Sequence, residues 1–227
     1  INTTILDNIS ITYNTGYTYG GGIHALHCNL IIAQKCNISQ NKATMGGGGL
    51  AFGLCNEVQF ISLQVNNNCA KKYGAGMYYK GRGLVNNSTK NLNHQSSSKF
   101  DNGSNTDIFR NHSCKIVKHS GSKTANQHSI ANLHIYTFKI ILCSFINNSA
   151  LENGAAIYAK NILNLIILSA YIFENNCESE SGIVFVEECT TMFKIIQSIF
   201  RQNIGGNIYF LNSETLKILS SNFSCNR

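Results

Sequence analysis

Proline is absent from all 227 residues of this chain. Because proline has no backbone N–H to donate to a strand ladder, its absence suits a fold in which nearly every N–H joins such a ladder. Long apolar runs are missing as well, since the longest, residues 162–173, is interrupted by Asn164 and Ser169. A membrane-spanning helix needs about 18 apolar residues or more, so we expect no transmembrane segment.

Charged residues are scarce, at 13% of the chain, with 18 basic against 11 acidic side chains. The formal excess of +7 is spread along the sequence and predicts a mildly basic, solvated surface. A nucleic-acid-binding face would need clustered lysines and arginines with aromatic residues among them, and no such cluster is visible. We therefore expect no nucleic-acid partner.

The sequence does contain a fixed period. Two sets of residues recur at steps of 27, namely Asn14, Asn41 and Asn68, and Gly20, Gly47 and Gly74. After a spacing of 80 residues from Asn68 the pattern returns at Asn148, and Asn175 follows 27 residues later. A constant period of about 20–50 residues is the signature of stacked structural repeats.

Apolar and polar residues alternate between these positions, as in segments 58–65 and 138–145. A period of two indicates short strands with one face buried. The Gly triplets and the β-branched alternation argue against a helical repeat. Several short strands per period, with Gly and Asn at the corners, predict an all-β fold, the right-handed parallel β-helix. Its coils would stack at the ~4.8 Å spacing of neighbouring strands.

Residues that share one coil position would form columns along the helix axis. We expect a column of hydrogen-bonded asparagines at a tight turn, where Asn also tolerates the left-handed backbone conformation. The glycine pairs would let the backbone turn where a Cβ atom would clash. The expected column comprises Asn14, Asn41, Asn68, Asn148, Asn175, Asn203 and Asn226.

The repeat lapses over segment 84–127, which is rich in Asn, Ser, Lys and His. Because the segment lacks the apolar alternation, we favour a long polar insertion within a single β-helix domain of residues 1–227. Two degenerate coils are the alternative, since the 80-residue spacing is close to three periods. Long loops of this kind are often functional.

Two short motifs alternate in a common register. Phe-x-x-Asn occurs at Phe145 to Asn148, Phe200 to Asn203 and Phe223 to Asn226, and a Gly-Gly-Ala-[Ile/Leu/Val] motif is similar to residues 154–157 and 47–50. Together they resemble the repeats of polymorphic outer-membrane proteins, which fall within the pectin-lyase-like right-handed β-helix class. The resemblance covers residues 1–83 and about 126–227, and it implies a surface passenger or adhesin.

Cysteine and glycosylation signals indicate the compartment. The chain has nine Cys and no Cys-x-x-Cys motif, so a zinc ribbon or a thioredoxin-like site has no support. Asn-x-Ser/Thr sequons begin at Asn2, Asn8, Asn37, Asn86, Asn87, Asn102, Asn111, Asn147 and Asn222. Many Cys and many sequons together favour the secretory pathway and an extracellular or cell-surface location. Asn37 and Asn222 should point outward, because each directly precedes an inward apolar position.

Cys28 and Cys55 share one coil position on neighbouring coils. Their sulfur atoms could form a disulfide, but in-register strands hold Cβ atoms farther apart than an ideal bridge prefers. The alternative, to which we give equal weight, is that both residues are buried free thiols. The odd ninth Cys predicts a free thiol or an intermolecular bridge.

The residues give little support to an enzymatic function. Asn105-Thr106-Asp107 is similar to a motif of polygalacturonase-type hydrolases, which need two carboxylates about 6.5–9.5 Å apart, but the family's other motifs are absent. A lyase would need an acidic calcium site, and the acidic clusters are only Glu187-Glu188 and Glu178 with Glu180. Adjacent strand residues point to opposite faces, so Glu187 and Glu188 cannot simply share a site.

A metal site is also disfavoured, because His24 and His27 would face opposite sides of a strand beside Cys28. We expect no catalytic, cofactor or metal site, and predict a non-catalytic extracellular protein that acts as a glycosylated spacer, adhesin or filament subunit. The alternatives are a carbohydrate-active β-helix enzyme and a ligand-binding module that uses segment 84–127.

Possible partners are N-glycans, cell-surface or matrix glycans and other copies of the chain. The sequence opens at Ile1 in the middle of a coil, without Met or a visible signal peptide, which suggests a mature fragment. It closes at the Asn226 position beside Cys225. Uncapped solenoid ends expose strand edges, so we expect copies to pair end to end as a filament. The alternative is that both ends are cut from a longer solenoid whose caps lie outside this sequence.

Overall fold

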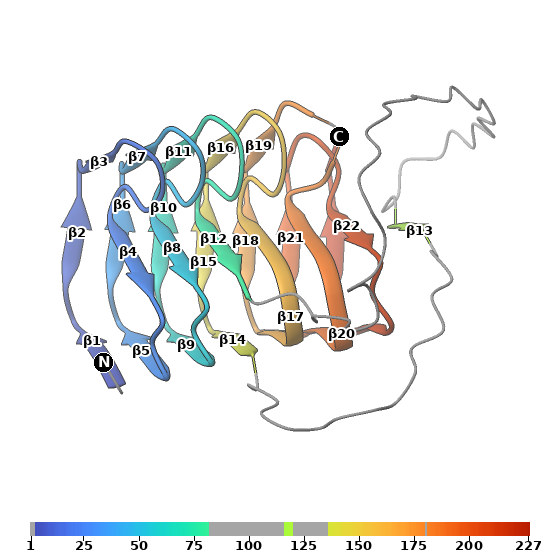
Figure 1. The fold of residues 1–227 in the computed structure, drawn as a ribbon. Coiled ribbons are helices and arrows are strands. Elements are labelled where there is room, and N and C mark those ends of the chain that lie inside the picture. The colour runs from blue at the N-terminus through green and yellow to red at the C-terminus, as the bar shows by residue number, and fades with distance from the viewer. Residues whose placement is uncertain (1–2, 82–115, 120–135, 180) are drawn as a thin grey trace, which may run out of the picture.

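The computed structural model describes residues 3–81, 116–119, 136–179 and 181–227, and these segments contain strands and turns but no helix. The strands belong to three sheets with parallel pairing, and they stack into a β-solenoid of about six turns about 27 residues apart (Figure 1). The predicted all-β parallel β-helix is therefore confirmed. The described part of the chain has no helix long and apolar enough to cross a membrane.

The largest sheet, sheet A, has 12 strands in two arms. The first arm contains β1 (Thr3–Asp7), β5 (Leu30–Gln34), β9 (Glu57–Ile61), β14 (Thr137–Ile141) and β23 (Leu216–Leu219). The second arm contains β4 (Ile23–Leu26), β8 (Leu50–Gly53), β12 (Met77–Lys80), β22 (Ile208–Leu211) and β13 (Ile116–His119). Two long strands, β17 (Ile157–Leu168) and β20 (Val184–Ile196), belong to both arms and join them.

Two narrower sheets complete each coil. Sheet B is formed by β2 (Ser10–Thr12), β6 (Asn37–Ser39), β10 (Gln64–Asn66), β15 (Ser144–Ile146), β18 (Tyr171–Phe173), β21 (Ile199–Arg201) and β24 (Asn222–Ser224). Sheet C is formed by β3 (Thr15–Gly16), β7 (Lys42–Ala43), β11 (Cys69–Ala70), β16 (Ser149–Ala150) and β19 (Asn176–Cys177). Within each coil the chain thus passes through the second arm, the first arm, sheet B and sheet C in that order.

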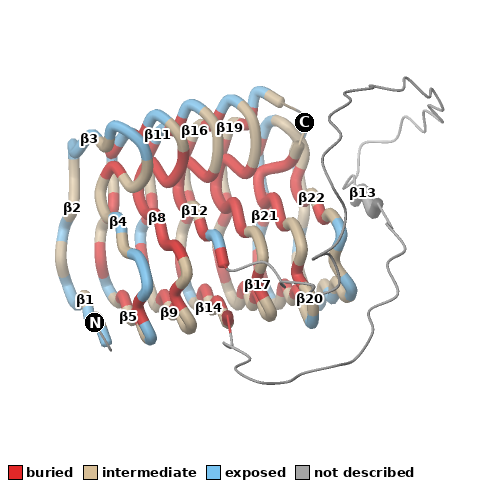
Figure 2. Tube along the Cα trace, in the orientation of Figure 1, coloured by how far each residue is buried: buried red, intermediate tan, exposed pale blue. Residues whose placement is uncertain are grey.

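The core fills the space that the coils enclose (Figure 2). Alternate side chains of each strand point inward, as in β9, where Val58 and Phe60 are buried and the residues between them are half-buried. Inward residues of successive coils stack, and the Phe60 ring lies 5.2 Å from the Phe138 ring in an edge-to-face arrangement. The period-two pattern of the sequence therefore corresponds to a continuous apolar column inside the solenoid.

Left-handed backbone marks three corners of the coil, and most of the residues there are not glycine. The corner between the first arm and sheet B carries Asn8, Lys35, Ser62, Leu142, Ser169, Gln197 and Ser220. The corner between sheets B and C carries Tyr13, Gln40, Asn67, Asn147, Glu174, Gln202 and Cys225. The corner between the two arms carries His27, Leu54, Asn161, Glu188 and Asn212.

The column asparagines do not themselves take this conformation. Each of them directly follows a left-handed residue, as Asn41 follows Gln40 and Asn148 follows Asn147. The left-handed residue turns the chain with its side chain outside, which lets the next side chain point inward. Glycine is required at the fourth turn, where a Cβ atom on Gly47 would lie 2.3 Å from the Leu50 carbonyl oxygen at φ +65°.

The two coils that flank segment 84–127 in the sequence are direct neighbours in space. β10 pairs with β6 on one side and β15 on the other, and Met77 of β12 is in register with Ile157 of β17. No further coil stands between them, so the repeat continues across the segment. Apart from β13, segment 84–127 lies outside the described residues.

β13 joins the solenoid at a different place from the one where its segment leaves. It pairs in parallel with β22, with Ile116 in register with Ile208, on the side of β22 that faces away from β20. The segment departs after β12, which is separated from β22 by β17 and β20 along the sheet. This strand edge of β22 is therefore occupied by a part of the same chain.

Candidate functional site on the outer face of the solenoid

The seven asparagines of the predicted column form one unbroken chain of hydrogen bonds. Asn68 shows the pattern, because its backbone N and its Nδ2 both donate to Asn148 Oδ1, at 3.0 and 3.1 Å. The same Nδ2 donates to the Ile38 carbonyl at 2.9 Å, which satisfies its second hydrogen. The links join Asn14, Asn41, Asn68, Asn148, Asn175, Asn203 and Asn226. The five inner members are buried, while Asn14 and Asn226 at its two ends are not. The column is structural, so any contact with another molecule would involve the outer face.

The described sequons lie on the outer surface. Asn222 is exposed on β24 and Asn37 is half-buried on β6. Asn8 and Asn147 are exposed at left-handed corners, and Asn147 Nδ2 donates to Asn67 Oδ1 at 2.7 Å. The remaining sequons, Asn2, Asn86, Asn87, Asn102 and Asn111, lie outside the described residues. Glycosylation stays a prediction.

Cys28 and Cys55 are both buried and both free thiols in the structure. Burial raises the pKa of the Cys55 thiol to about 11, and the Cys55 Sγ donates to the Gly53 carbonyl at 3.4 Å. Cys55 therefore stays protonated near neutral pH and is a poor nucleophile. A disulfide between them stays a prediction.

The residues considered for catalysis or metal binding are not brought together. Glu187 is held by Lys160, whereas Glu188 occupies a left-handed corner and Glu178 is exposed elsewhere. His24 is exposed on β4 and His27 lies at a corner, while the neighbouring Cys28 is buried. Within the described ranges no three His, Cys, Asp or Glu side chains are grouped to hold a metal. Asn105, Thr106, Asp107 and Glu180 lie outside these ranges.

The outer face of the second arm carries an aromatic column that was not predicted from the sequence. Tyr78, Tyr158, Phe185 and Tyr209 are in register on β12, β17, β20 and β22. Successive rings lie 5.3, 5.2 and 4.8 Å apart and are within 6° of parallel. Stacked pairs of this kind contribute about 0.5–1.5 kcal/mol each beyond their burial. We call these four residues the aromatic column.

Corner residues extend this column. Tyr19 packs on Tyr78 at 5.0 Å and Tyr73 packs on Tyr158 at 5.1 Å. Gly46 makes room, since a Cβ atom there would lie 2.9 Å from the Tyr78 ring. The sequence does contain a signal for this column. In four of six coils, an aromatic residue directly follows the first apolar residue after the glycine turn.

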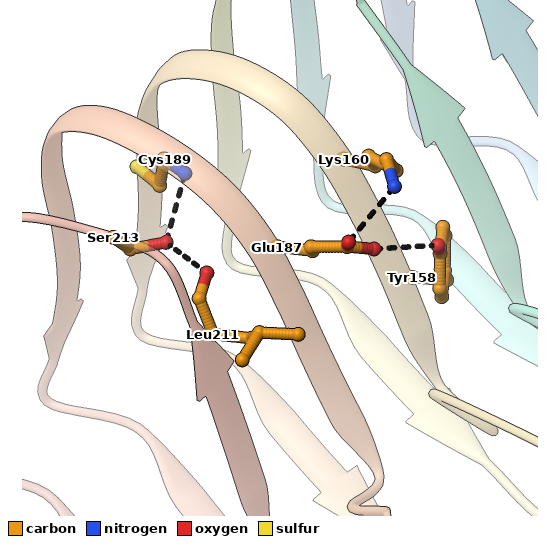
Figure 3. A network of polar contacts seen from close by, with 6 residues as sticks. All are labelled: Tyr158, Lys160, Glu187, Cys189, Leu211 and Ser213. Atoms are coloured by element: carbon orange, nitrogen blue, oxygen red, sulfur yellow. Dashed lines mark hydrogen bonds and ion pairs between the residues drawn. The ribbon is translucent and has the colours of Figure 1, made fainter. Parts of the chain in front are cut away.

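Charged side chains run beside the aromatic column. Lys80 and Lys160 are in register on β12 and β17, and Glu187 occupies the same position on β20. Lys160 Nζ lies 2.8 Å from Glu187 Oε1, and the Tyr158 hydroxyl donates to Glu187 Oε2 at 3.3 Å (Figure 3). Burial and then the Glu187 charge raise the pKa of Tyr158 well above its usual range, so its hydroxyl stays protonated. The exposed Lys80 makes no ion pair with any described residue.

Among the described residues of this face, Glu187 is the carboxylate, and it is paired with Lys160. The exposed Lys80 and the half-buried Tyr78 and Tyr209 are described polar groups that this face presents to solvent. They suit the binding of a ligand with hydroxyl and anionic groups.

Comparison with known families links one coil of the chain to a characterised repeat. Residues 142–160 match the Chlamydia polymorphic membrane protein (Chlamydia_PMP) repeat. The matched stretch begins at the left-handed corner of Leu142 and includes both predicted motifs, Phe145 to Asn148 and 154–157. No curated protein and no solved structure matches the chain. The resemblance predicted from the motifs is therefore confirmed over this coil.

Proposed function

We propose that this chain is a rigid, non-catalytic module of a surface protein that works as a scaffold and an adhesin. The uninterrupted asparagine column supports the scaffold role, because it ties successive coils together through hydrogen bonds that are buried except at the two ends. The match to a membrane-protein repeat supports a surface location, and an extracellular position follows as part of the proposal.

The outer face of the second arm is the proposed contact surface. The observation that carries this proposal is the aromatic column with Lys80 and Lys160 beside it. Tyrosine hydroxyls can donate to and accept from sugar hydroxyls, and an exposed lysine can pair with a carboxylate or a sulfate. An acidic cell-surface or matrix glycan is therefore the partner class that this face favours.

A binding titration with a defined acidic oligosaccharide tests the proposal. Lys80→Gln should weaken binding by about two- to fivefold, the size of one exposed ion pair, because Lys80 has no described carboxylate partner. Lys42→Gln is the matched control, since Lys42 is also exposed but lies on β7 of sheet C. Equal affinity of the two variants would contradict the assignment of this face. Product formation from the oligosaccharide would favour the enzyme reading instead.

End-to-end assembly of copies is part of the same proposal for a structural protein. β13 opposes strand pairing between copies at this end, because it occupies the edge of β22 that another strand would need. Negative-stain electron microscopy of the native protein distinguishes filaments from separate rods.

A further inference from the structure

One corner of the solenoid has an apolar outer surface. Outward residues at the end of each first-arm strand are in register and aliphatic over five successive coils, and we call them the aliphatic row: Ile61, Ile141, Leu168, Ile196 and Leu219. Their strand neighbours Ile140, Ile167 and Ile195 are buried in the core, so the row faces outward. The row is half-buried up to Ile196, and Leu219 is 51% exposed.

The apolar surface continues around the corner onto sheet B. Leu142, at the left-handed corner, is 60% exposed, and Ile199 on β21 is 42% exposed. Tyr171 and Phe173 on the neighbouring strand β18 stack with ring centroids 5.4 Å apart. Large exposed apolar patches on soluble proteins mark contact with another molecule.

The patch is confined to the later coils. At the positions of the aliphatic row, the first two coils carry Asp7 and Gln34 instead. On sheet B, the residues in register with Tyr171 are Asn37 and Gln64 in the earlier coils. The fold therefore tolerates polar residues at these positions, and the apolar ones are not needed for coil stacking.

Two lysines that border the row have no carboxylate partner among the described residues. Lys194 of β20 and Lys217 of β23 are directly in register, two positions before Ile196 and Leu219. Neither makes an ion pair with a described residue, whereas Lys139 on the same face is paired with Glu57 at 3.1 Å. Like charges directly opposite on neighbouring strands repel each other, and an anionic ligand would relieve that repulsion.

We propose that this corner docks on an anionic lipid surface, with the aliphatic row and Leu142 entering the interface and Lys194 and Lys217 contacting phosphate groups. The combination of exposed aliphatic residues with adjacent cations is what interfacial membrane binding requires. A second copy of the chain fits less well, because its formal charge of +7 would bring like charges together at the lysines.

The surface is separate from the one proposed for glycans. The aliphatic row and its lysines lie on the first arm, while the aromatic column and Lys80 lie on the second arm. The variants below leave Lys80 and the aromatic column unchanged. Failure of lipid binding and failure of glycan binding are therefore distinguishable.

A glycan on Asn222 would lie beside Ile199, with which Asn222 is in register, so the proposal concerns the chain with Asn222 unmodified. Flotation with lipid vesicles tests it on the full chain expressed without N-glycosylation. Binding is expected to vesicles rich in phosphatidylglycerol and to be much weaker to pure phosphatidylcholine. Lys194→Gln with Lys217→Gln should lower partitioning by more than about tenfold, since each lysine near an anionic membrane contributes about fivefold.

A second pair of variants addresses the apolar contribution. Leu142→Ser and Leu219→Gln should also lower partitioning, and both should fold, because Ser62 and Gln34 already occupy the same coil positions. Leu151→Ser is the matched control, as Leu151 is 45% exposed but lies beyond sheet C. Circular dichroism of each variant verifies the fold.

Three results would overturn the proposal. The first is equal binding to neutral and anionic vesicles by the native chain and the lysine variants. The second is competition by soluble glycerol phosphate together with no effect of the leucine variants, which would indicate a site for soluble anions only. The third is a concentration-dependent dimer in vesicle-free buffer that the leucine variants abolish, which would assign the corner to a protein interface.

Discussion

Asn68 and Asn148 are 80 residues apart in the chain, yet Asn68 Nδ2 donates to Asn148 Oδ1 at 3.1 Å. The geometry is the same as between Asn41 and Asn68, which are 27 residues apart and have the same contact at 3.2 Å. The hydrogen bond between two members therefore does not depend on the length of chain between them. What matters is that the two coils are adjacent.

Removing one member should break the column at a buried position. Asn68→Ala leaves the N–H and the side chain of Asn41 without their acceptor, Asn68 Oδ1, and we expect a loss of about 1–3 kcal/mol in the free energy of unfolding. Urea denaturation monitored by circular dichroism measures it. Gln64→Ala, exposed on β10, is the control and should be nearly neutral. Equal midpoints for the two variants would count against the column's contribution.

The aromatic column should contribute to stability through its rings rather than its hydroxyls. Tyr158 is only 7% exposed and stacks on both Tyr78 and Phe185, so Tyr158→Ala should cost about 3–5 kcal/mol. Tyr158→Phe keeps the stack and loses a long 3.3 Å hydrogen bond to Glu187, so it should cost less than about 1 kcal/mol. Thermal unfolding compares them, with Tyr17→Ala (93% exposed) as the neutral control. Similar losses of stability for the Ala and Phe variants would contradict the assignment of the contribution to the ring rather than the hydroxyl.

Buried thiols predict a loss of stability at alkaline pH. Burial raises the pKa of Cys143 and of Cys189 from 9.0 to about 11. Between these values the unfolded chain releases protons that the folded chain retains, so the free energy of unfolding falls as pH rises from 9 to 11. The contribution is fully present below pH 9, and each thiol can add a slope of up to about 1.4 kcal/mol per pH unit.

Urea midpoints measured between pH 8 and pH 10.5 test this dependence. Cys143→Ala should show a shallower decline than the native chain, and it should fold because Ala170 occupies the equivalent position one coil later. Parallel curves for the two proteins would remove Cys143 as a contributor. Exposed Cys69 and Cys225 should react with a thiol reagent in the folded protein, whereas Cys143 should not.

Deleting the insertion should leave the solenoid intact. Removal of residues 83–135 returns the 80-residue spacing between Asn68 and Asn148 to 27, and Arg82→Cys restores the residue type of Cys28 and Cys55 at that coil position. We expect a cooperative unfolding transition and an unchanged strand signal in circular dichroism. An aggregated or unfolded product would show that the segment, β13 included, is needed for folding. Loss of ligand binding with retained fold would support the reading of 84–127 as a binding module.

Glycan attachment can be read directly from native material. Asn222 is exposed and Asn37 is half-buried, both on sheet B strands with their side chains outside the core. We expect peptide mapping to find N-glycans at both positions. Unmodified Asn37 and Asn222 would remove the main support for passage through a glycosylating secretory pathway.

The period, the fold class and the members of the asparagine column could all be predicted from the amino-acid sequence. These follow from repetition, because a residue type that recurs every 27 positions must meet its own kind on the next coil. Motif spacing also identified the coil at 142–160 that matches the known repeat. Local alternation was sufficient to assign the inward face of β9 and β14.

Other features depend on how the coils pack in three dimensions. Leu54 and Leu142 adopt left-handed backbone that their side chains disfavour, because the neighbouring coils impose the corner on them. Pairing of β13 with β22 joins segments that no repeat relates. The aromatic column and the aliphatic row depend on which coils are adjacent across the 80-residue spacing, a relation set by stacking in space rather than by order along the chain.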